Sequence, residues 1–177
     1  MSSTCFRAAG KLILLCAFLS GAHAALCQRP ALQGAWVWHE RWTSAPKDVN
    51  PDLRYAGAII LYLGEDGNFT RWSGTLYSQN HHLPTISAGD SETLSAGSWM
   101  PIPHGVRLTM RKFYSDVIMN HETFPGPTQV AETQLRGKVL IFDRLSYRRA
   151  PNLDQQMIPF EDQARKTGVL GPHPPAH

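Results

Sequence analysis

GAIILYLGEDGNFTRWSGTLY, residues 57–77, has the pattern of two β-strands joined by a tight turn. It begins with a short apolar, partly β-branched run over residues 58–63 and ends with a run of aromatic, threonine and small residues over 69–77. Both compositions are typical of β-strands. Residues 65–68 (EDGN) supply a turn, because glycine readily adopts the positive φ that tight hairpins need. The stretch therefore predicts an antiparallel hairpin centred on Gly67.

A period of two marks further strands along the chain. Val106, Leu108 and Met110 alternate with polar residues, which places the apolar side chains on one face of a half-buried strand. The alternation slips by one residue near Arg111, as a β-bulge would cause. A glycine at position 137 predicts another tight turn. The expected strands are residues 34–42, 57–64, 68–77, 94–100, 104–111, 113–119, 128–135 and 139–147.

These segments predict an all-β domain, an antiparallel up-and-down (meander) barrel of about eight strands. The connecting stretches lack the 3.6-residue apolar stripe of a crossover helix, so neighbouring strands should pair antiparallel. A long, bent segment such as 104–119 favours closure of the sheet into a barrel. Two long connections, 43–56 and 78–93, interrupt the meander and are candidates for functional loops.

The N-terminal residues 1–24 have the order of a signal peptide. Arg7 and Lys11 form a positive start, residues 12–19 form an apolar core, and Ala22-His23-Ala24 fits a cleavage site. The apolar run is shorter than the roughly 20 residues that a membrane-spanning helix needs. We expect cleavage after Ala24, no stable membrane span, and a secreted or periplasmic protein; an uncleaved anchor is the alternative.

Cleavage would leave Cys27 as the one cysteine, because Cys5 and Cys16 lie in the leader. A single cysteine cannot form an internal disulfide, so a free thiol near the new terminus is expected, with lipid attachment or an intermolecular bridge as alternatives. The formal net charge of +3 falls to +1 once Arg7 and Lys11 are removed. This balance gives no support to a nucleic-acid partner.

The barrel domain is expected over residues 25–149, followed by a C-terminal extension over 150–177 that is largely irregular. Residues 159–166 could form one or two helical turns. The sequence GPHPP at 171–175 cannot supply the hydrogen bonds of a strand ladder. We therefore expect a disordered tail after Lys166.

The first expected strand begins Leu32-Gln33-Gly34-Ala35-Trp36. A Gly-x-Trp at the head of the first strand of an all-β chain of this size resembles the lipocalin-like barrels of the calycin superfamily. In that family the tryptophan closes the barrel floor and an arginine from the last strand lies across its ring. The resemblance implies that Trp36 and Arg144 form a structural barrel-closure pair. A guanidinium stacked on an indole would contribute roughly 0.5–2 kcal/mol.

Sequence motifs for catalysis and for metal binding are not found. The chain has no phosphate-binding loop and no Gly-x-Ser-x-Gly elbow. His39-Glu40 and His121-Glu122 each lack the second histidine of a zinc-protease helix, and the adjacent pair His81-His82 is expected to be solvated. We expect no catalytic residue, no metal and no cofactor, which favours a protein that is not an enzyme.

Aromatic residues are frequent in the expected strands. Trp36, Trp38 and Trp42 share one face if a period of two holds through residue 42. Three indoles would overfill a small barrel as core but suit the wall of a cavity, so plain core, which the sequence favours slightly, and cavity wall both stay open. The expected function is an exported, non-catalytic barrel that binds a small, largely apolar molecule in its cup. The candidate ligand-binding residues are Trp38, Trp42, Tyr62, Trp72, Trp99 and Phe142.

Two other functions stay open. The first is an envelope protein-protein interaction module that uses the loop 78–93 and a basic cluster of Arg144, Arg148 and Arg149. The second is a barrel enzyme that uses Asp143 with a cavity histidine. Asp143 interrupts an apolar face within the expected strand 139–147, so it is either paired in the interior or marks a change of face.

Overall fold

The computed structural model describes residues 31–48, 50–80, 82–86, 92–117, 120–124, 128–166, 168 and 170–171. The expected signal peptide (1–24), Cys27 and the proline-rich end of the chain lie outside the described residues. In the described part, no helix has the length and apolar character needed to cross a bilayer.

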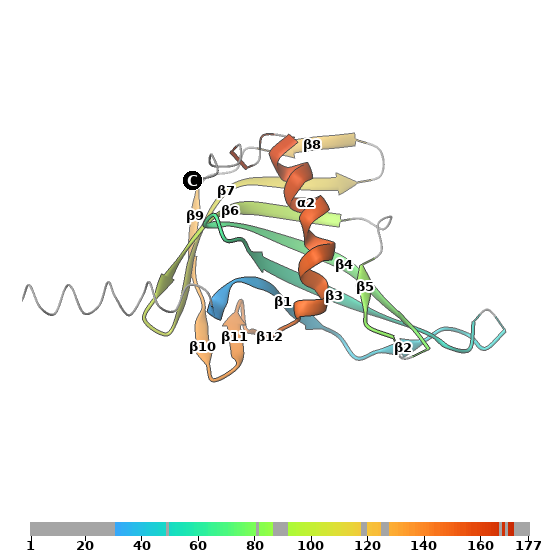
Figure 1. Cartoon of the computed structure of the whole chain (residues 1–177). Coiled ribbons are helices and arrows are strands. Elements are labelled where there is room, and N and C mark those ends of the chain that lie inside the picture. Colours follow the sequence, from blue (N-terminus) through green and yellow to red (C-terminus); the bar gives the residue numbers. More distant parts are fainter. Residues whose placement is uncertain are drawn as a thin grey trace, which may run out of the picture.

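Twelve strands form a single sheet in this part of the chain (Figure 1). Every strand pair is antiparallel, as predicted. The strands are β1 (Gly34–His39), β2 (Thr43–Ser44), β3 (Leu53–Leu63), β4 (Asn68–Gln79), β5 (Thr85–Ile86), β6 (Glu92–Ile102), β7 (Gly105–Val117), β8 (Asn120–Phe124), β9 (Gln129–Glu132), β10 (Gln134–Arg136), β11 (Val139–Phe142) and β12 (Leu145–Arg149). A 3₁₀ turn, η1 (Pro151–Leu153), and one α-helix, α2 (Asp154–Lys166), follow the last strand.

The sheet curls until its first and last strands meet. β1 pairs with β3 on one side and with β12 on the other, so that Trp36 lies opposite both Leu61 and Arg149. At the other seam, β9 pairs with β7 and β10 pairs with β11, while the backbone N–H of Thr133 between them donates to Val106 O at 2.9 Å. The fold is therefore the nearly closed antiparallel barrel that the sequence predicts.

Eight strands build the wall if β9 and β10 are counted as one strand bent at Thr133, since β2, β5 and β8 only extend the edges of β3, β4 and β7. The hairpin centred on Gly67 is confirmed, because β3 and β4 pair from Leu53↔Gln79 to Leu63↔Phe69. Gly67 has a φ of +83°, a conformation that residues with a side chain rarely adopt.

The bulge expected near Arg111 is also present. Met110 lies opposite Gly97 and Lys112 lies opposite Ala96, so Arg111 has no residue opposite it. The segments 104–111 and 113–119 therefore belong to one bent strand, β7. Its first half pairs with β9 and its second half pairs with β8, so the neighbour of β7 in the wall changes at the bend.

The expectation of a single strand over 139–147 is wrong. Residues 139–149 form the hairpin β11–β12, in which Phe142 lies opposite Leu145 and the two turn residues are Asp143 and Arg144. Both have positive φ values, 52° and 64°, as the tightest hairpin turns require. The turn was missed because it contains no glycine, although aspartate tolerates this conformation better than most residues.

Side chains from all the wall strands except β9 fill much of the barrel interior. We call the following residues the inner cluster, which consists of Leu32, Trp36, Leu61, Leu63, Phe69, Trp99, Val106, Leu108, Leu140 and Tyr147, with Trp38, Ile59, Met110, Leu135, Phe142 and Leu145 packed against them. Two buried indoles have their N–H groups satisfied by backbone carbonyls. Trp36 donates to Leu32 O at 2.8 Å, and Trp99 donates to Gly64 O at 2.9 Å.

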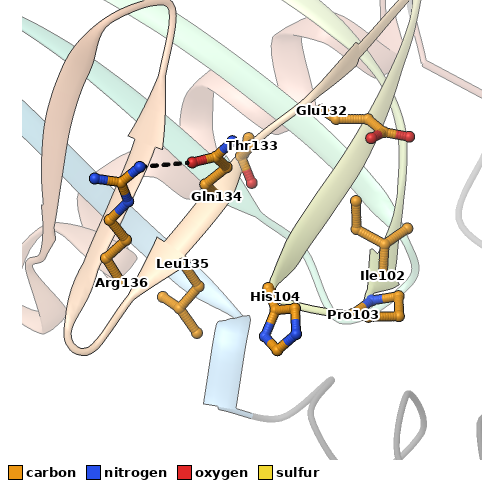
Figure 2. A pocket seen from close by; sticks show the side chains of 8 residues that line it. All are labelled: Ile102, Pro103, His104, Glu132, Thr133, Gln134, Leu135 and Arg136. Atoms are coloured by element: carbon orange, nitrogen blue, oxygen red, sulfur yellow. Dashed lines mark hydrogen bonds between the residues drawn. The ribbon is translucent and has the colours of Figure 1, made fainter.

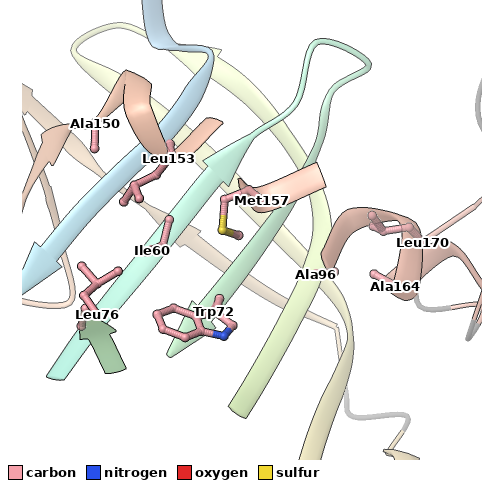
Figure 3. Close-up of a cluster of buried hydrophobic side chains, with 11 residues drawn as sticks. Ile60, Trp72, Leu76, Ala96, Ala150, Leu153, Met157, Ala164 and Leu170 are labelled. Atoms are coloured by element: carbon pink, nitrogen blue, oxygen red, sulfur yellow. The ribbon is translucent and has the colours of Figure 1, made fainter. Parts of the chain in front are cut away.

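The helix α2 covers the outer face of one wall, where it lies across the sheet in Figure 1. The outer cluster beneath it consists of Ala35, Ala58, Ile60, Trp72, Leu76, Ala96, Ala150, Leu153, Met157, Ala164 and Leu170. Figure 3 shows Leu153 and Met157 on the side of the helical segment that faces Ile60 and Trp72 of the sheet. The ring of Phe160 lies 6.1 Å from that of Trp72.

The C-terminal extension is thus not largely irregular. Leu153, Met157, Phe160 and Ala164 repeat at the spacing of one helix face, and this stripe buries its apolar side chains on the sheet. The one or two turns expected over 159–166 are the second half of a helix of 13 residues. Pro159 lies inside this helix and cannot donate a backbone hydrogen bond. Because proline normally argues against a helix interior, the apolar stripe is difficult to recognise from the sequence.

A buried ion-pair network fixes the end of α2 to the β3–β4 turn. The Arg165 guanidinium donates to the carboxylates of Asp66 and Glu161, with 2.7 Å to Glu161 Oε1, and the three side chains are at most 14% exposed. Burial alone would raise the pKa of Asp66, but hydrogen bonds from Asn68 and Arg165 outweigh it and hold that pKa below its ordinary value. The network therefore depends on an ionised Asp66.

Candidate functional site

A cavity of about 480 Å³ lies on the inner side of the wall. Its lining residues are Phe69, Arg71, Leu108, Met110, Gln129, Val130, Ala131, Phe142 and Asp143. Phe69, Leu108, Met110 and Phe142 belong to the inner cluster, so the cavity is continuous with the apolar interior. Asp143 is exposed on the β11–β12 turn and marks the rim.

The strand register explains why space is left at this place. Leu108 and Met110 are two residues apart on β7 and therefore point to the same face, as do Phe69 and Arg71 on β4. On β9, the residue opposite Leu108 is Ala131, whose methyl group fills little of the interior. Elsewhere the interior holds larger side chains of the inner cluster, such as Trp36, Trp99 and Tyr147.

Arg71 is the cationic side chain of the cavity wall. It is half-buried, and its guanidinium carbon lies 5.7 Å from the centroid of the Phe142 ring. Its strand neighbours are Leu61 on β3 and Ser95 on β6, neither of which carries a charge. The Arg71 Nε atom is buried without a hydrogen-bond partner. A guanidinium group stays charged in proteins, so Arg71 places a positive charge at the cavity wall.

Tyr147 on β12 lies close to both Arg71 and Phe142. Its ring is fully buried, with its centroid 6.4 Å from that of Phe142, and its hydroxyl has no partner at standard hydrogen-bond geometry. Burial raises the pKa of Tyr147, whereas the charge of Arg71 and the approach of its N–H groups to the phenol oxygen oppose this, and the carboxylate of Asp143 adds to the effect of burial. Tyr147 is therefore a neutral phenol at physiological pH and does not neutralise Arg71.

Three of the six predicted ligand-binding residues lie in the barrel interior. Phe142 lines the cavity, whereas Trp99 is fully buried and Trp38 is half-buried in the inner cluster. Trp36 and Trp38 face the same side, as the period of two predicts. Of these three residues, Trp38 and Trp99 therefore belong to the core, and only Phe142 lines the cavity.

The other three residues lie on the outer face. Trp72 is fully buried beneath α2, and Trp42 and Tyr62 pack against the same outer cluster. Burial, together with the charges of Glu161 and Asp154, raises the pKa of Tyr62. Trp42 does not share the face of Trp36 and Trp38 as predicted, because β1 ends at His39 and the alternation of a strand does not continue beyond it. The six residues therefore do not converge on one site.

Arg144 does not occupy the position that the barrel-closure pair requires. It is exposed on the β11–β12 turn, while the last-strand residue opposite Trp36 is Arg149. The Arg149 side chain donates to Ala35 O at 3.1 Å and forms an ion pair with Asp154 at 2.6 Å. Arg149 therefore ties β12 and β1 to the start of α2, and the proposed basic cluster with Arg144 and Arg148 is partly neutralised.

A second depression of about 430 Å³ surrounds the start of β7 and the bend between β9 and β10 (Figure 2). The polar residues in its lining include His104, Glu132, Gln134 and Arg136. Glu132 is already paired with Arg107 at 2.7 Å, and Arg136 donates to Gln134 at 3.2 Å. Because these groups already bind one another, this depression offers fewer unsatisfied groups than the barrel cavity.

The barrel cavity is lined by six apolar residues together with Arg71, Gln129 and Asp143. Asp143 lines it, but no histidine is among its described lining residues, so the pairing expected for a barrel enzyme is not seen there. Across the described ranges, no three His, Cys, Asp or Glu side chains gather as metal ligands. The chain matches no protein-family model, no curated protein and no solved structure.

Sequence reasoning missed Arg71, although a signal was present. Arg71 follows Phe69 by two residues in a predicted strand, so it had to share the face of that phenylalanine. An arginine that shares a strand face with an inward-pointing phenylalanine is informative, because a charge is costly to bury without a partner. This pattern marks the position as a candidate binding residue.

Proposed function

We propose that this protein is a lipocalin-like binding protein that holds a small, largely apolar molecule in the barrel cavity and does not act on it chemically. The observation that carries the proposal is the cavity of about 480 Å³ walled by Phe69, Leu108, Met110 and Phe142. This volume is within the range of roughly 300–1,000 Å³ found for small-molecule sites. Apolar walls favour an apolar ligand, because burial removes its surface from water.

The family likeness in this proposal is supported by the architecture. The antiparallel, nearly closed barrel and the position of Trp36 at the head of β1 are compatible with a lipocalin-like fold. The signal-like residues 1–24 support export to the periplasm or the medium. Export fits a binding role, because such a protein would meet its ligand outside the cytoplasm.

Isothermal titration calorimetry with decanol, a neutral apolar probe, tests the binding function. Two variants provide the contrast. Ala131→Trp places an indole in the cavity, and Ser146→Trp places the same ring on the exposed outer side of β12. We expect saturable binding by the wild type and by Ser146→Trp, and at least a roughly 10-fold loss for Ala131→Trp because the indole occupies the ligand's space. Absence of binding by the wild type, or equal binding by all three proteins, would overturn the proposal.

A further inference from the structure

The charge of Arg71 lacks a counter-charge among the described residues. Ion pairs within 4.0 Å are formed by Arg107, Arg149 and Arg165, and none of them involves Arg71. Asp143, which shares the cavity lining, lies on the exposed turn and forms no ion pair with it. A half-buried cation that lines an apolar cavity is costly unless something pairs with it.

The side chains around Arg71 fix the guanidinium but leave its charge free. The Phe142 ring covers one side at 5.7 Å, and the neutral Tyr147 phenol lies behind it. Arginine offers only donors, and its Nε is buried without an acceptor. What is missing at this place is therefore an acceptor with a negative charge, and the side that is open to it is the cavity.

From this arrangement we infer that the ligand carries one carboxylate, which Arg71 binds at the cavity wall while the apolar remainder packs against Phe69, Leu108 and Met110. This inference rests on the proposed function. The planar guanidinium fork matches the two oxygens of a carboxylate. The negative charge of Asp143 at the rim disfavours a group with two or more charges, such as a phosphate monoester. In this assignment Tyr147 is a positioning residue for Arg71.

Calorimetric titration at about pH 7 with four probes tests this inference, since a carboxylic acid is ionised there. The probes are decanoate, decanol, decyltrimethylammonium and acetate. We expect decanoate to bind the wild type at least about 10-fold more tightly than decanol, because a hydrogen bond to a charged group is stronger than one to a neutral group. The cationic probe should bind more weakly than decanol, and acetate should not bind measurably because it lacks the apolar part.

Three variants and a control locate the effect. Arg71→Met should lower the affinity for decanoate to that for decanol and leave decanol binding unchanged. Tyr147→Phe should reduce the preference for decanoate by a few-fold while keeping the buried ring. Asp143→Asn, on the exposed turn, should increase decanoate affinity without affecting decanol. Arg107→Met removes a cation from the outer surface and should change neither affinity.

The outcomes separate this inference from the proposed function. If the wild type binds decanol as tightly as decanoate, the binding function stands and the carboxylate site is overturned. The same holds if Arg71→Met keeps the preference for decanoate, or if Asp143→Asn has no effect in a folded protein. If neither decanol nor decanoate binds the wild type, both proposals are wrong. Should Arg71→Met fail to fold, Tyr147→Phe and Asp143→Asn still decide between these outcomes.

Discussion

The Arg71 guanidinium lies 5.7 Å from the centre of the Phe142 ring, and both side chains line the cavity. Arg71 is the fourth residue of β4, whereas Phe142 is the last residue of β11, beside the turn that the sequence did not predict. The contact therefore exists only because the barrel closes and the β11–β12 hairpin folds back. In this contact the Phe142 ring covers one side of the charged Arg71 guanidinium at the cavity wall.

Arg71 is expected to weaken the fold of the ligand-free protein. Arg71→Met replaces an uncompensated, half-buried cation by an apolar side chain of similar length, so the free energy of unfolding should stay equal or rise by about 1 kcal/mol. For a chain of this size such a gain shifts the Tm by about 2–4 °C. Differential scanning calorimetry without ligand measures the effect. A clear loss of stability would mean that Arg71 has a structural partner and is not held for a ligand.

The ion-pair network at Asp66 should make the stability of the fold depend on pH. Because the folded pKa of Asp66 is lowered, its ionisation stabilises the fold above the pKa of an unfolded aspartate, about 3.9, and this contribution is lost as the pH falls through the folded value. Asp66→Asn should be less stable than the wild type by about 1–3 kcal/mol at neutral pH, with a difference that shrinks below about pH 4. Urea unfolding between about pH 7 and pH 2 measures both curves.

The exposed pair Arg107–Glu132 gives the control for this experiment. Both side chains are about half exposed, so Glu132→Gln should change stability by less than about 0.5 kcal/mol. A difference between Asp66→Asn and the wild type that persists unchanged at low pH would show that the carboxylate charge is not what stabilises the network.

The helix α2 should contribute to stability through its buried face. Met157 is fully buried on the side of α2 that packs on the sheet, whereas the next residue, Ile158, is 39% exposed. Met157→Ala should cost about 2–5 kcal/mol because it leaves a cavity in the outer cluster, while Ile158→Ala should cost about 1 kcal/mol or less. Thermal or urea unfolding of the two variants checks the orientation of the helix. Equal losses would contradict the packing of α2 on the sheet.

Arg149 and Arg144 should differ in how much each contributes to stability. Arg149 bonds to Ala35 O and to Asp154, so Arg149→Ala should lower the free energy of unfolding by about 1–3 kcal/mol. Arg144 is exposed on the turn, so Arg144→Ala should leave the tryptophan emission unchanged and the stability within about 0.5 kcal/mol. A red-shifted emission in Arg144→Ala would restore the pair with Trp36 that the family resemblance implied.

The sequence predicts the architecture well because alternation and turn glycines are local signals. The hairpin at Gly67, the bulge at Arg111 and the antiparallel meander all follow from residues close to each other in the chain. The turn at Asp143 carried no glycine and was missed. The helix α2 was recognised only in part, because Pro159 interrupts a stripe that is stabilised by the sheet beneath it.

The candidate site could be predicted less well, for a physical reason. The period of two tells which residues share a face of one strand, but both faces of β1, β3 and β4 are apolar here, since α2 covers the outer one. The aromatic residues Tyr62 and Trp72 were therefore assigned to the wrong side. Arg71 is a more informative signal than the aromatic residues. Burial beneath a helix accounts for an aromatic side chain, but it does not account for a charged one next to Phe69 on the same face.

Binding of a ligand inside the barrel can be followed at single side chains through the methyl NMR signals of the methionines. Three described methionines report on three places: Met110 lines the cavity, Met157 lies beneath α2, and Met100 is 52% exposed on β6. In a protein labelled with ¹³C at the methionine methyl groups, titration with decanol should move the Met110 signal saturably and leave those of Met100 and Met157 in place. Movement of Met157 without Met110, or saturation without any change at Met110, would contradict binding in the barrel.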